Sequence, residues 1–408
     1  MDFRQQFPAL ERPVYGRPLV YFDNAATAQR PRSVLDLQEK LALEANGNIH
    51  RAVHYLATEA TERYEAGRET VRVFLNAPSR ENVILTAGTT ASINLVADCF
   101  CQRFVGAGDR ILVSEAEHHS NLVPWQLACG RRGAAVEAWP VDEAGELSPE
   151  WLDERLRSAA GRIKLVAVTH VSNILGIVNP VRDIVATAHR YGVPVLLDGA
   201  QGIVHERVDV QALDCDFYAF SGHKIYAPTG IGALYGKKEY LEEMPPYMGG
   251  GEMIGTVSFE KTTWAPLPLK YEAGTPNFTA AACFVPALET ARAMAEDAEL
   301  QDNLHAMRDY LREELGRIEG LRIYGTPADP GRKIPLFSFT VEGAFAGDLA
   351  LILDKAGIAV RSGHNCAEPL LHRFGQTSVL RASLAPYNTL AECEYFIRSL
   401  RRAIGMLR

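Results

Sequence analysis

Short runs of consecutive apolar residues alternate with longer stretches in which apolar residues recur at helical spacing. Runs of the first kind are 3 to 5 residues long and occupy 83–85, 111–113, 165–168, 193–197 and 217–220. The spacing predicts helices over 55–76, 92–104, 149–159 and 181–191. Strands that are apolar on both faces and alternate with amphipathic helices are typical of a parallel sheet covered on both sides. We therefore predict an α/β fold with a mainly parallel sheet.

The pattern changes towards the C-terminus, where helices are followed by strands and helices in a different order. Strands are predicted at 321–324, 335–341, 358–361 and 380–384, with helices from about 280, over 303–319 and 348–356, and finally over 390–406. The glycine-rich segment 248–253 and the segment 272–277 are expected to be loops. We predict a large domain over 16–295 and a smaller α+β domain formed by 296–408 together with 1–15.

Polar side chains cluster just after the apolar runs. The clusters are Thr89 and Thr90; His118 and His119; Asn173; Asp198 and Gln201; and Ser221, His223 and Lys224. In sheets of this kind, ligands bind beyond the carboxyl ends of the strands. The coincidence predicts one shared site that contains all of these side chains.

Composition and charge narrow the classes of protein. The 408 residues are enough for two domains, and the net charge of -8 argues against broad binding of nucleic acids or acidic membranes. No apolar run approaches the roughly 20 residues of a membrane span. The first residues lack the pattern of a signal peptide, and the seven cysteines form no CxxC pair. We expect a cytoplasmic protein with free thiols and no metal site.

Lys224 lies between two apolar runs, 217–220 and 231–235. Burial disfavours the charged form of a lysine and lowers its pKa, which makes the amine a nucleophile, although an ordinary surface turn remains the alternative. Gly88 and two threonines at a predicted helix start favour a phosphate, although a threonine cap is the simpler explanation of that feature alone. A phosphate-bearing aldehyde that binds Lys224 fits both features, and pyridoxal 5'-phosphate is such a cofactor.

Three further side chains suit this cofactor. Asp198 ends a buried strand, where a carboxylate must be paired, and the ring nitrogen of pyridoxal phosphate would pair it. Gln201 is placed to contact the phenolate oxygen of the ring. We expect His119 to lie over the ring face and to move protons near neutral pH, and we expect the adjacent His118 to be structural.

Four motifs stand out along the chain: Glu117-His118-His119-Ser120-Asn121, Asp198-Gly199-Ala200-Gln201, Ser221-Gly222-His223-Lys224 and Arg361-Ser362-Gly363-His364-Asn365-Cys366. Together they resemble those of group II cysteine desulfurases of the Suf/Csd type. These enzymes belong to the class V aminotransferase family and to fold-type I of the pyridoxal-phosphate enzymes. The resemblance covers essentially the whole chain and implies a large domain with a sheet of the seven-stranded type.

The resemblance implies roles for the predicted residues. Lys224 would carry the cofactor and remove the substrate α-proton, while Asp198, Gln201 and His119 would contact the ring. The phosphate would be bound by Thr89, Thr90, Ser221 and His223, and by Thr275 of a second subunit, which makes a homodimer functional. Arg381 would bind the substrate carboxylate in a bidentate manner, which suits arginine. Other residues implied for the substrate pocket are Asn173, Arg361, His50 and Arg51.

Cys366 separates a desulfurase from an aminotransferase. It lies on a polar loop where a thiolate can be exposed and activated, although an ordinary loop cysteine has the same surroundings. The resemblance implies that Cys366 attacks the sulfur of L-cysteine and leaves L-alanine and a persulfide. The sulfur would pass to an acceptor protein of the SufE, CsdE or SufU type, for iron–sulfur clusters or other sulfur compounds.

Several positions depart from the family pattern, and several functions remain open. Ala87 and Ala91 flank the Gly-Thr-Thr segment where Arg and Glu are usual, Ala227 replaces a glycine, and Asn365 and Glu368 differ near the cysteine. A selenocysteine lyase shares the fold and a similar loop. A class V aminotransferase or a kynureninase-like lyase would not need Cys366. A non-enzymatic sulfur-carrier scaffold would lack the cofactor.

Overall fold

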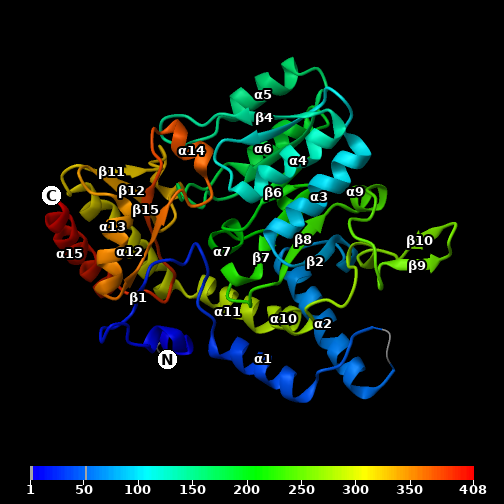
Figure 1. Cartoon of the computed structure of the whole chain (residues 1–408), viewed down its shortest axis with the longest axis horizontal. Coiled ribbons are helices and arrows are strands. Elements are labelled where there is room, and N and C mark those ends of the chain that lie inside the picture. Colours follow the sequence, from blue (N-terminus) through cyan, green and yellow to red (C-terminus); the bar gives the residue numbers. More distant parts are fainter. Residues whose placement is uncertain (1–2, 51–52) are drawn as a thin grey trace.

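The computed structural model describes residues 3–50 and 53–408, and its largest element is a seven-stranded sheet (Figure 1). The strands, in spatial order, are β2 (Val83–Thr86), β8 (Gly232–Gly236), β7 (Phe217–Ser221), β6 (Val195–Asp198), β5 (Ile163–Thr169), β3 (Arg110–Ser114) and β4 (Ala135–Trp139). Strand β8 runs antiparallel to both of its neighbours, and all other pairs are parallel. The predicted mainly parallel sheet is confirmed.

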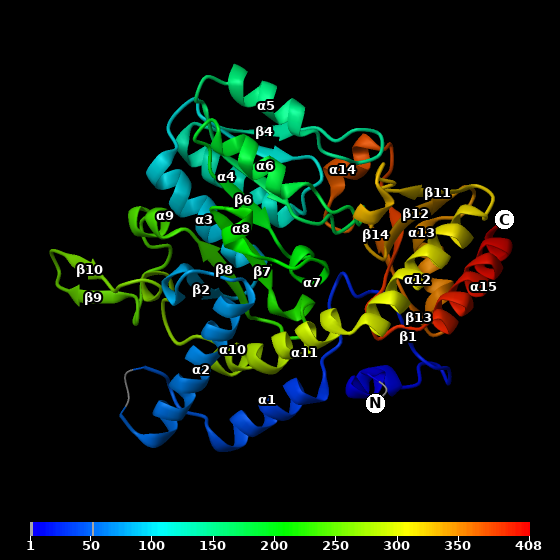
Figure 2. The ribbon, with the colours of Figure 1, turned by 180° about the vertical axis from the view of Figure 1, so that it is seen from behind.

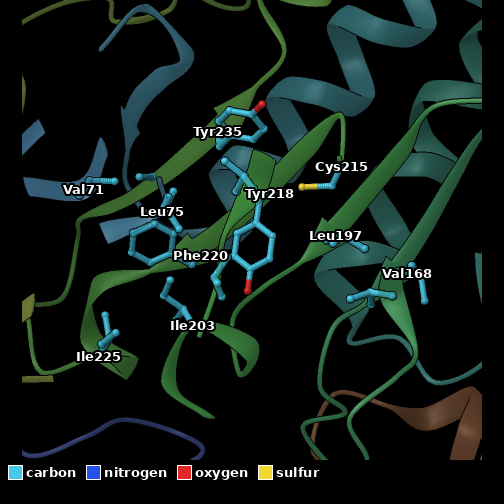
Figure 3. Packing of buried hydrophobic residues seen from close by; sticks show 14 of the residues in the cluster. Val71, Leu75, Val168, Leu197, Ile203, Cys215, Tyr218, Phe220, Ile225 and Tyr235 are labelled. Atoms are coloured by element: carbon cyan, nitrogen blue, oxygen red, sulfur yellow. The ribbon is translucent and has the colours of Figure 1, made fainter. Parts of the chain in front are cut away.

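Strand β7 shows why the central strands are apolar throughout. All five of its residues are buried. Tyr218 and Phe220 belong to one hydrophobic core, whereas Phe217 and Ala219 belong to a second core. Successive side chains of a strand point to opposite faces, so this sheet is packed on both faces. Figure 3 shows Tyr218 and Phe220 among residues of the first core, Ile203 included.

Helices cover both faces of the large sheet. The core that contains Phe217 includes residues of α3 (Thr89–Phe104), α4 (Val123–Arg132) and α9 (Lys238–Glu243). The core that contains Tyr218 includes residues of α1 (Arg32–Glu44), α2 (Tyr55–Phe74), α5 (Pro149–Ser158), α6 (Val181–His189), α7 (Gly202–His205), α8 (Val210–Leu213), α10 (Phe278–Ala282) and α11 (Phe284–Glu296). Helix α3 begins three residues before its predicted start, so Thr89 and Thr90 lie in its first turn.

A second, antiparallel sheet stands beside the first (Figures 1 and 2). Its strands, in order, are β11 (Leu321–Tyr324), β12 (Leu336–Val341), β15 (Val379–Ser383) and β14 (Arg361–Gly363). It shares one core with α12 (Ala298–Gly316), α13 (Ala346–Lys355) and α15 (Leu390–Leu407). This unit has the predicted α+β pattern. The predicted domain boundary at 295/296 lies close to the break between α11 and α12, and it stays a prediction.

Two details of this region differ from the sequence interpretation. The single strand predicted over 358–361 is two strands, because β13 (Ile358–Ala359) pairs with β1 (Val20–Tyr21) while β14 pairs with β15. Val20 and Phe22 therefore pack into the core of the C-terminal unit, although the sequence grouped them with the large domain.

A hairpin of β9 (Ile254–Val257) and β10 (Thr262–Trp264) was not predicted, and it projects from the body in both views (Figures 1 and 2). Its side chains are mostly exposed, so no core periodicity marked it in the sequence. Within residues 3–50 and 53–408, no helix combines the length and apolar character that a membrane span requires.

Candidate active site

A cavity of about 270 Å³ lies where the carboxyl edge of the large sheet meets the C-terminal unit. Most of the residues predicted for the site line it together, although they come from segments far apart in the sequence. They are Thr89, Thr90, Asn173, Asp198, Gln201, Ser221, His223, Lys224, Arg361, Cys366 and Arg381. The strand ends converge as expected for a parallel sheet.

Lys224 ends a short 3-10 helix (Gly222–Lys224) that follows β7 directly. Its side chain lines the cavity. Burial lowers the pKa of the amine to about 8, although the negative charge of Asp198 raises it. A lysine with this pKa is substantially neutral near pH 8, so it is a competent nucleophile and base.

Asp198 is the last residue of β6 and is 3% exposed. One oxygen of its carboxylate accepts the Ala200 N–H at 2.9 Å, and burial raises the pKa of the group. A buried carboxylate of this kind is stabilised by a cationic partner. Nearby, Gln201 donates one Nε2 proton to the Ala25 carbonyl at 2.8 Å, which fixes the amide and leaves its second proton for another acceptor.

The first turn of α3 forms a cradle with the end of β7. The backbone N–H of Thr89 donates to Ser221 Oγ at 2.8 Å, and the two hydroxyls are also 2.8 Å apart. Gly88 precedes the helix with a φ of 145°, and a Cβ built there would lie 3.1 Å from Ser221 Oγ. Hydroxyls, backbone N–H groups and the helix dipole at one point suit a phosphate.

The two adjacent histidines are placed differently from the sequence interpretation. His118 lines the cavity, and its pKa is lowered to about 4 by burial and by the charge of Lys224. His119 is not among the lining residues; its backbone N–H donates to the Cys366 carbonyl at 2.7 Å. The chain enters a 3-10 helix (His119–Asn121) here, which turns consecutive side chains in different directions. Of the two histidines, His118 therefore lines the cavity and His119 does not, and contact of either ring with a cofactor stays a prediction.

His118 is also held in place by its role as the cap of that 3-10 helix. Its Nδ1 accepts the Ser120 N–H at 3.1 Å and lies 2.7 Å from Ser120 Oγ. Burial keeps the ring neutral at physiological pH, as its lowered pKa shows. A histidine followed two residues later by serine was the available sequence signal for this cap.

Two arginines enter the cavity from facing positions of neighbouring strands. Arg361 on β14 pairs in register with Arg381 on β15. The Asp23 carboxylate accepts hydrogen bonds from Arg361 Nη2 at 2.8 Å and from Arg381 Nη2 at 3.2 Å. Arg381 Nη1 donates to the Asn173 carbonyl at 2.9 Å, whereas its buried Nε has no partner among the described residues. A carboxylate ligand would satisfy that donor.

Cys366 lies on the loop between β14 and α14 (Glu368–Arg373) and lines the same cavity as Lys224. Asn365 and Cys366 adopt left-handed φ angles of 49° and 55°, which costs about 1–2 kcal/mol per residue. Asn173 Nδ2 donates to the Asn365 carbonyl at 2.9 Å and so ties the loop to the large unit. Because the other six cysteines are buried, Cys366 is the accessible thiol.

Two further predicted residues, Thr275 and His50, do not line this cavity. Thr275 is exposed on the loop before α10. His50 lies against α2, where its Nε2 is 3.3 Å from the Glu65 carboxylate, and it does not line the cavity. Arg51 lies outside the described residues.

Sequence reasoning missed two acidic residues that support the site. Asp23 was part of a turn of small residues, and nothing in that turn indicated its link to two distant arginines. Glu117 is buried, and burial raises the pKa of its carboxyl to about 8. It accepts hydrogen bonds from Ser114, from Asn121 Nδ2 at 2.7 Å and from the Thr169 N–H at 2.7 Å. Its place inside the histidine motif was the available signal.

The lysine, the buried carboxylate and the cradle at the carboxyl ends of these strands define a fold-type I pyridoxal-phosphate enzyme, and a cysteine lines the same cavity. A profile of the class-V aminotransferases matches residues 20–396. The chain belongs to the class-V aminotransferase family, whose cofactor is pyridoxal 5'-phosphate.

Relatives within that family match over their full lengths. A probable cysteine desulfurase of Vibrio cholerae is 43% identical over 404 residues, which cover 99% of this chain and 98% of the relative. A cysteine desulfurase of Cronobacter sakazakii is 44% identical over 411 residues, which cover 100% of this chain and 98% of the relative.

Solved structures of cysteine desulfurases have the same fold as this chain. The cysteine desulfurase CsdA of Escherichia coli superposes with a TM-score of 0.89 at 39% identity, covering 100% of this chain and 98% of that chain. The cysteine desulfurase of Thermococcus onnurineus gives a TM-score of 0.92 at 34% identity, with the same coverage of the two chains.

Proposed function

We propose that this protein is a pyridoxal-phosphate-dependent cysteine desulfurase, which converts L-cysteine to L-alanine and leaves the sulfur as a persulfide on Cys366. The observation that carries the proposal is that Lys224 and Cys366 line one cavity, although 142 positions separate them (366 − 224). An aminotransferase needs the lysine but has no use for the cysteine. The full-length relatives named as cysteine desulfurases support the same activity.

The residues of the cavity fit the cofactor. Lys224 would bind its aldehyde, the buried Asp198 would hold the proton of its ring nitrogen, and Gln201 would donate to its phenolate oxygen. The cradle of Thr89, Thr90, Ser221 and His223 would bind the phosphate, and we assign the ring face to His118 rather than to His119. When bound, pyridoxal phosphate stabilises negative charge that develops at the substrate α-carbon.

Arg381 orients the substrate in this proposal. Its unpartnered Nε and its buried position favour a carboxylate, and Asp23 and the Asn173 carbonyl keep the guanidinium in place. Arg361 closes the same side of the cavity with its own link to Asp23. With the carboxylate held there, the rest of L-cysteine would lie in the cavity that Lys224 and Cys366 both line.

Lys224 removes the α-proton, which its lowered pKa permits near pH 8. The Cys366 thiolate attacks the substrate sulfur, so that an S–S bond forms as the C–S bond breaks. The electron pair of the broken bond stays with the three-carbon product, which is protonated to alanine. Because Cys366 is on a loop that opens to solvent, its persulfide is accessible to a sulfur acceptor.

The proposal includes a homodimer in which Thr275 reaches the phosphate of the other subunit's cofactor. Thr275 is exposed and does not line its own cavity, which supports a role in a second copy. His50 is partly buried and does not line its own cavity either, and Arg51 belongs to this proposal as well. Exposed apolar residues of the projecting hairpin region, Val257, Phe259 and Trp264, provide contact area. We further propose a cytoplasmic protein with an acceptor of the SufE, CsdE or SufU type.

The test combines product analysis with mapping of the sulfur. The purified protein is expected to absorb near about 420 nm, to form L-alanine from L-cysteine and to carry a persulfide that mass spectrometry maps to Cys366. Cys366→Ala should keep the absorbance and lose alanine formation, while the matched variant Cys393→Ala, which removes a core thiol, should keep both. Unchanged alanine formation by Cys366→Ala would exclude the proposed mechanism.

A further inference from the structure

Three potential metal ligands from two distant segments meet at the mouth of the cavity. The imidazole nitrogens of His119 and His364 and the sulfur of Cys366 lie within 4.8 Å of one another. His364 is exposed, and His119 and Cys366 are partly buried, so solutes reach the cluster from solvent. His364 and Cys366 are two positions apart in the sequence, and the fold brings His119 to them from a distant segment.

The cluster is held by hydrogen bonds of the backbone. The His119 N–H donates to the Cys366 carbonyl at 2.7 Å, which ties the two segments together. The two rings pack with their centroids 5.5 Å apart at an angle of 33°. The left-handed backbone of Cys366 fixes the direction of its side chain. A cluster whose backbone is already ordered loses little conformational freedom when it binds a ligand.

Each imidazole already directs a lone pair towards the segment 366–368. His364 Nδ1 accepts the Cys366 N–H at 3.1 Å, and His119 Nε2 accepts the Glu368 N–H at 3.3 Å. A metal ion can take these two lone pairs in place of the amide protons. Both amides lie in solvent-accessible surroundings, where water replaces the lost hydrogen bonds.

We propose that His119, His364 and Cys366 form a binding site for a zinc-class divalent ion, which sequesters the cysteine sulfur. Two imidazoles and one thiolate are a ligand set that zinc prefers, with water as the fourth ligand on the open side. Tetrahedral zinc places such ligand atoms about 3.5 Å apart. Side-chain rotations that move the ligand atoms by about 1 Å would therefore complete the site. Binding releases the thiol proton to solvent, and the ion is neither oxidised nor reduced.

The consequence of this site rests on the proposed function. A sulfur that donates its electron pair to the metal cannot attack the substrate, so the ion is a reversible inhibitor that competes with persulfide formation. The ion lies at the cavity mouth and not among the cofactor ligands, so the bound cofactor and its absorbance stay unchanged. Free zinc would thereby couple sulfur mobilisation to the metal supply.

The binding is tested with cobalt(II) added anaerobically to the untagged holoenzyme, with a readout that does not depend on turnover. We expect the visible bands of tetrahedral cobalt and a near-ultraviolet band from thiolate to cobalt. Cys366→Ser should abolish the near-ultraviolet band, and His119→Ala and His364→Ala should each raise the Kd by about tenfold or more. The matched control is His372→Ala, which removes another exposed histidine of the same region and should bind cobalt normally.

A second measurement uses zinc and alkylation. Zinc should protect Cys366 from iodoacetamide, as read by mass spectrometry, with the same apparent affinity at which it inhibits alanine formation, and a chelator should reverse both effects. Bands that survive in Cys366→Ser, or Kd values of His119→Ala and His364→Ala that stay within twofold of the parent, would overturn the site. Spectra and protection without any turnover of L-cysteine would overturn the proposed function alone.

Discussion

The Asp23 carboxylate accepts a hydrogen bond from Arg381 Nη2 at 3.2 Å, while Nε of the same guanidinium is buried and has no partner among the described residues. Asp23 and the Asn173 carbonyl therefore hold the two terminal nitrogens of the arginine and leave Nε for a ligand. Since the same carboxylate binds Arg361, it sets the positions of both arginines that line the cavity. Asp23 acts through the arginines and is a positioning residue.

Replacing this carboxylate tests that role. In Asp23→Asn the amide keeps the size of the side chain but loses the charge that orients both guanidinium groups. We expect the KM for L-cysteine to rise by about tenfold with a smaller change in kcat, because a charge-assisted hydrogen bond contributes about 1.5–3 kcal/mol. Steady-state kinetics measure the two constants. Glu243→Gln, which breaks the exposed pair with Arg103, is the control and should change neither; an unaltered KM in Asp23→Asn would refute the role.

The lowered pKa of Lys224 makes the loading of the cofactor dependent on pH. Only the neutral amine attacks an aldehyde, and the pKa of this amine is about 8, below its ordinary value because of burial. The rate of cofactor incorporation into the apoprotein should therefore rise about tenfold per pH unit below pH 8 and level off above it. The growth of absorbance near about 420 nm measures this rate.

Removing the charge of Asp198 tests the electrostatic origin of the pKa of Lys224. Its negative charge raises the pKa of Lys224, so Asp198→Asn should lower that pKa further and shift the midpoint of incorporation to lower pH. The midpoint is read independently of the amplitude, which falls because the variant binds the cofactor less tightly. A midpoint that moves to higher pH in Asp198→Asn would contradict the electrostatic account.

The sequence could predict those site residues that lie at the ends of parallel strands, because the sheet brings these ends together. Lys224 and Asp198 follow apolar runs, and in a parallel sheet the ends of such runs meet at one edge, so local pattern and topology were sufficient. Cys366 joined them only through the resemblance, because its loop belongs to a different unit. The fold class followed from the same alternation, and it is confirmed.

What could not be predicted depends on directions and partners that periodicity does not encode. Nothing in two adjacent histidines decides between His118 and His119, since the 3-10 turn that separates them is set by capping contacts. Asp23 contacts two arginines that are 338 and 358 positions away in the sequence, which no local pattern reports. The strand predicted over 358–361 divides because each part has a different neighbour, which is a tertiary effect.

Breaking the buried ion pair between Arg68 and Glu272 should lower the stability of the protein strongly. Arg68 is 0% exposed and binds the Glu272 carboxylate at 2.6 Å, while Glu272 also accepts the Tyr64 hydroxyl at 2.7 Å. Glu272→Gln leaves the arginine charge buried without full compensation, which costs about 3–5 kcal/mol. We expect a clear drop of the thermal midpoint of the holoenzyme, measured by circular dichroism.

The control for this pair is Glu69→Gln, which removes a partly exposed partner of Arg72 and Arg80. Such surface pairs contribute about 0–1 kcal/mol, so the midpoint should stay close to that of the parent protein. Equal effects of the two substitutions would show that burial does not control the strength of these pairs here.

Gly88 is the position where the backbone itself shapes the phosphate cradle. Its φ of 145° is a conformation that L-residues rarely adopt, and an added Cβ would lie 3.1 Å from Ser221 Oγ. Gly88→Ala therefore strains the turn and displaces a hydroxyl of the cradle, at a cost of about 1–3 kcal/mol. Because the strain falls on the phosphate donors, we expect the Kd for pyridoxal phosphate to rise about tenfold or more, as measured by fluorescence titration of the apoprotein.

Gly130→Ala is the matched control. This glycine lies in α4, where an added Cβ would meet no atom within 4 Å, so the substitution should leave cofactor affinity unchanged and raise stability slightly. Parent-like affinity in Gly88→Ala would mean that the phosphate is held elsewhere in the cavity.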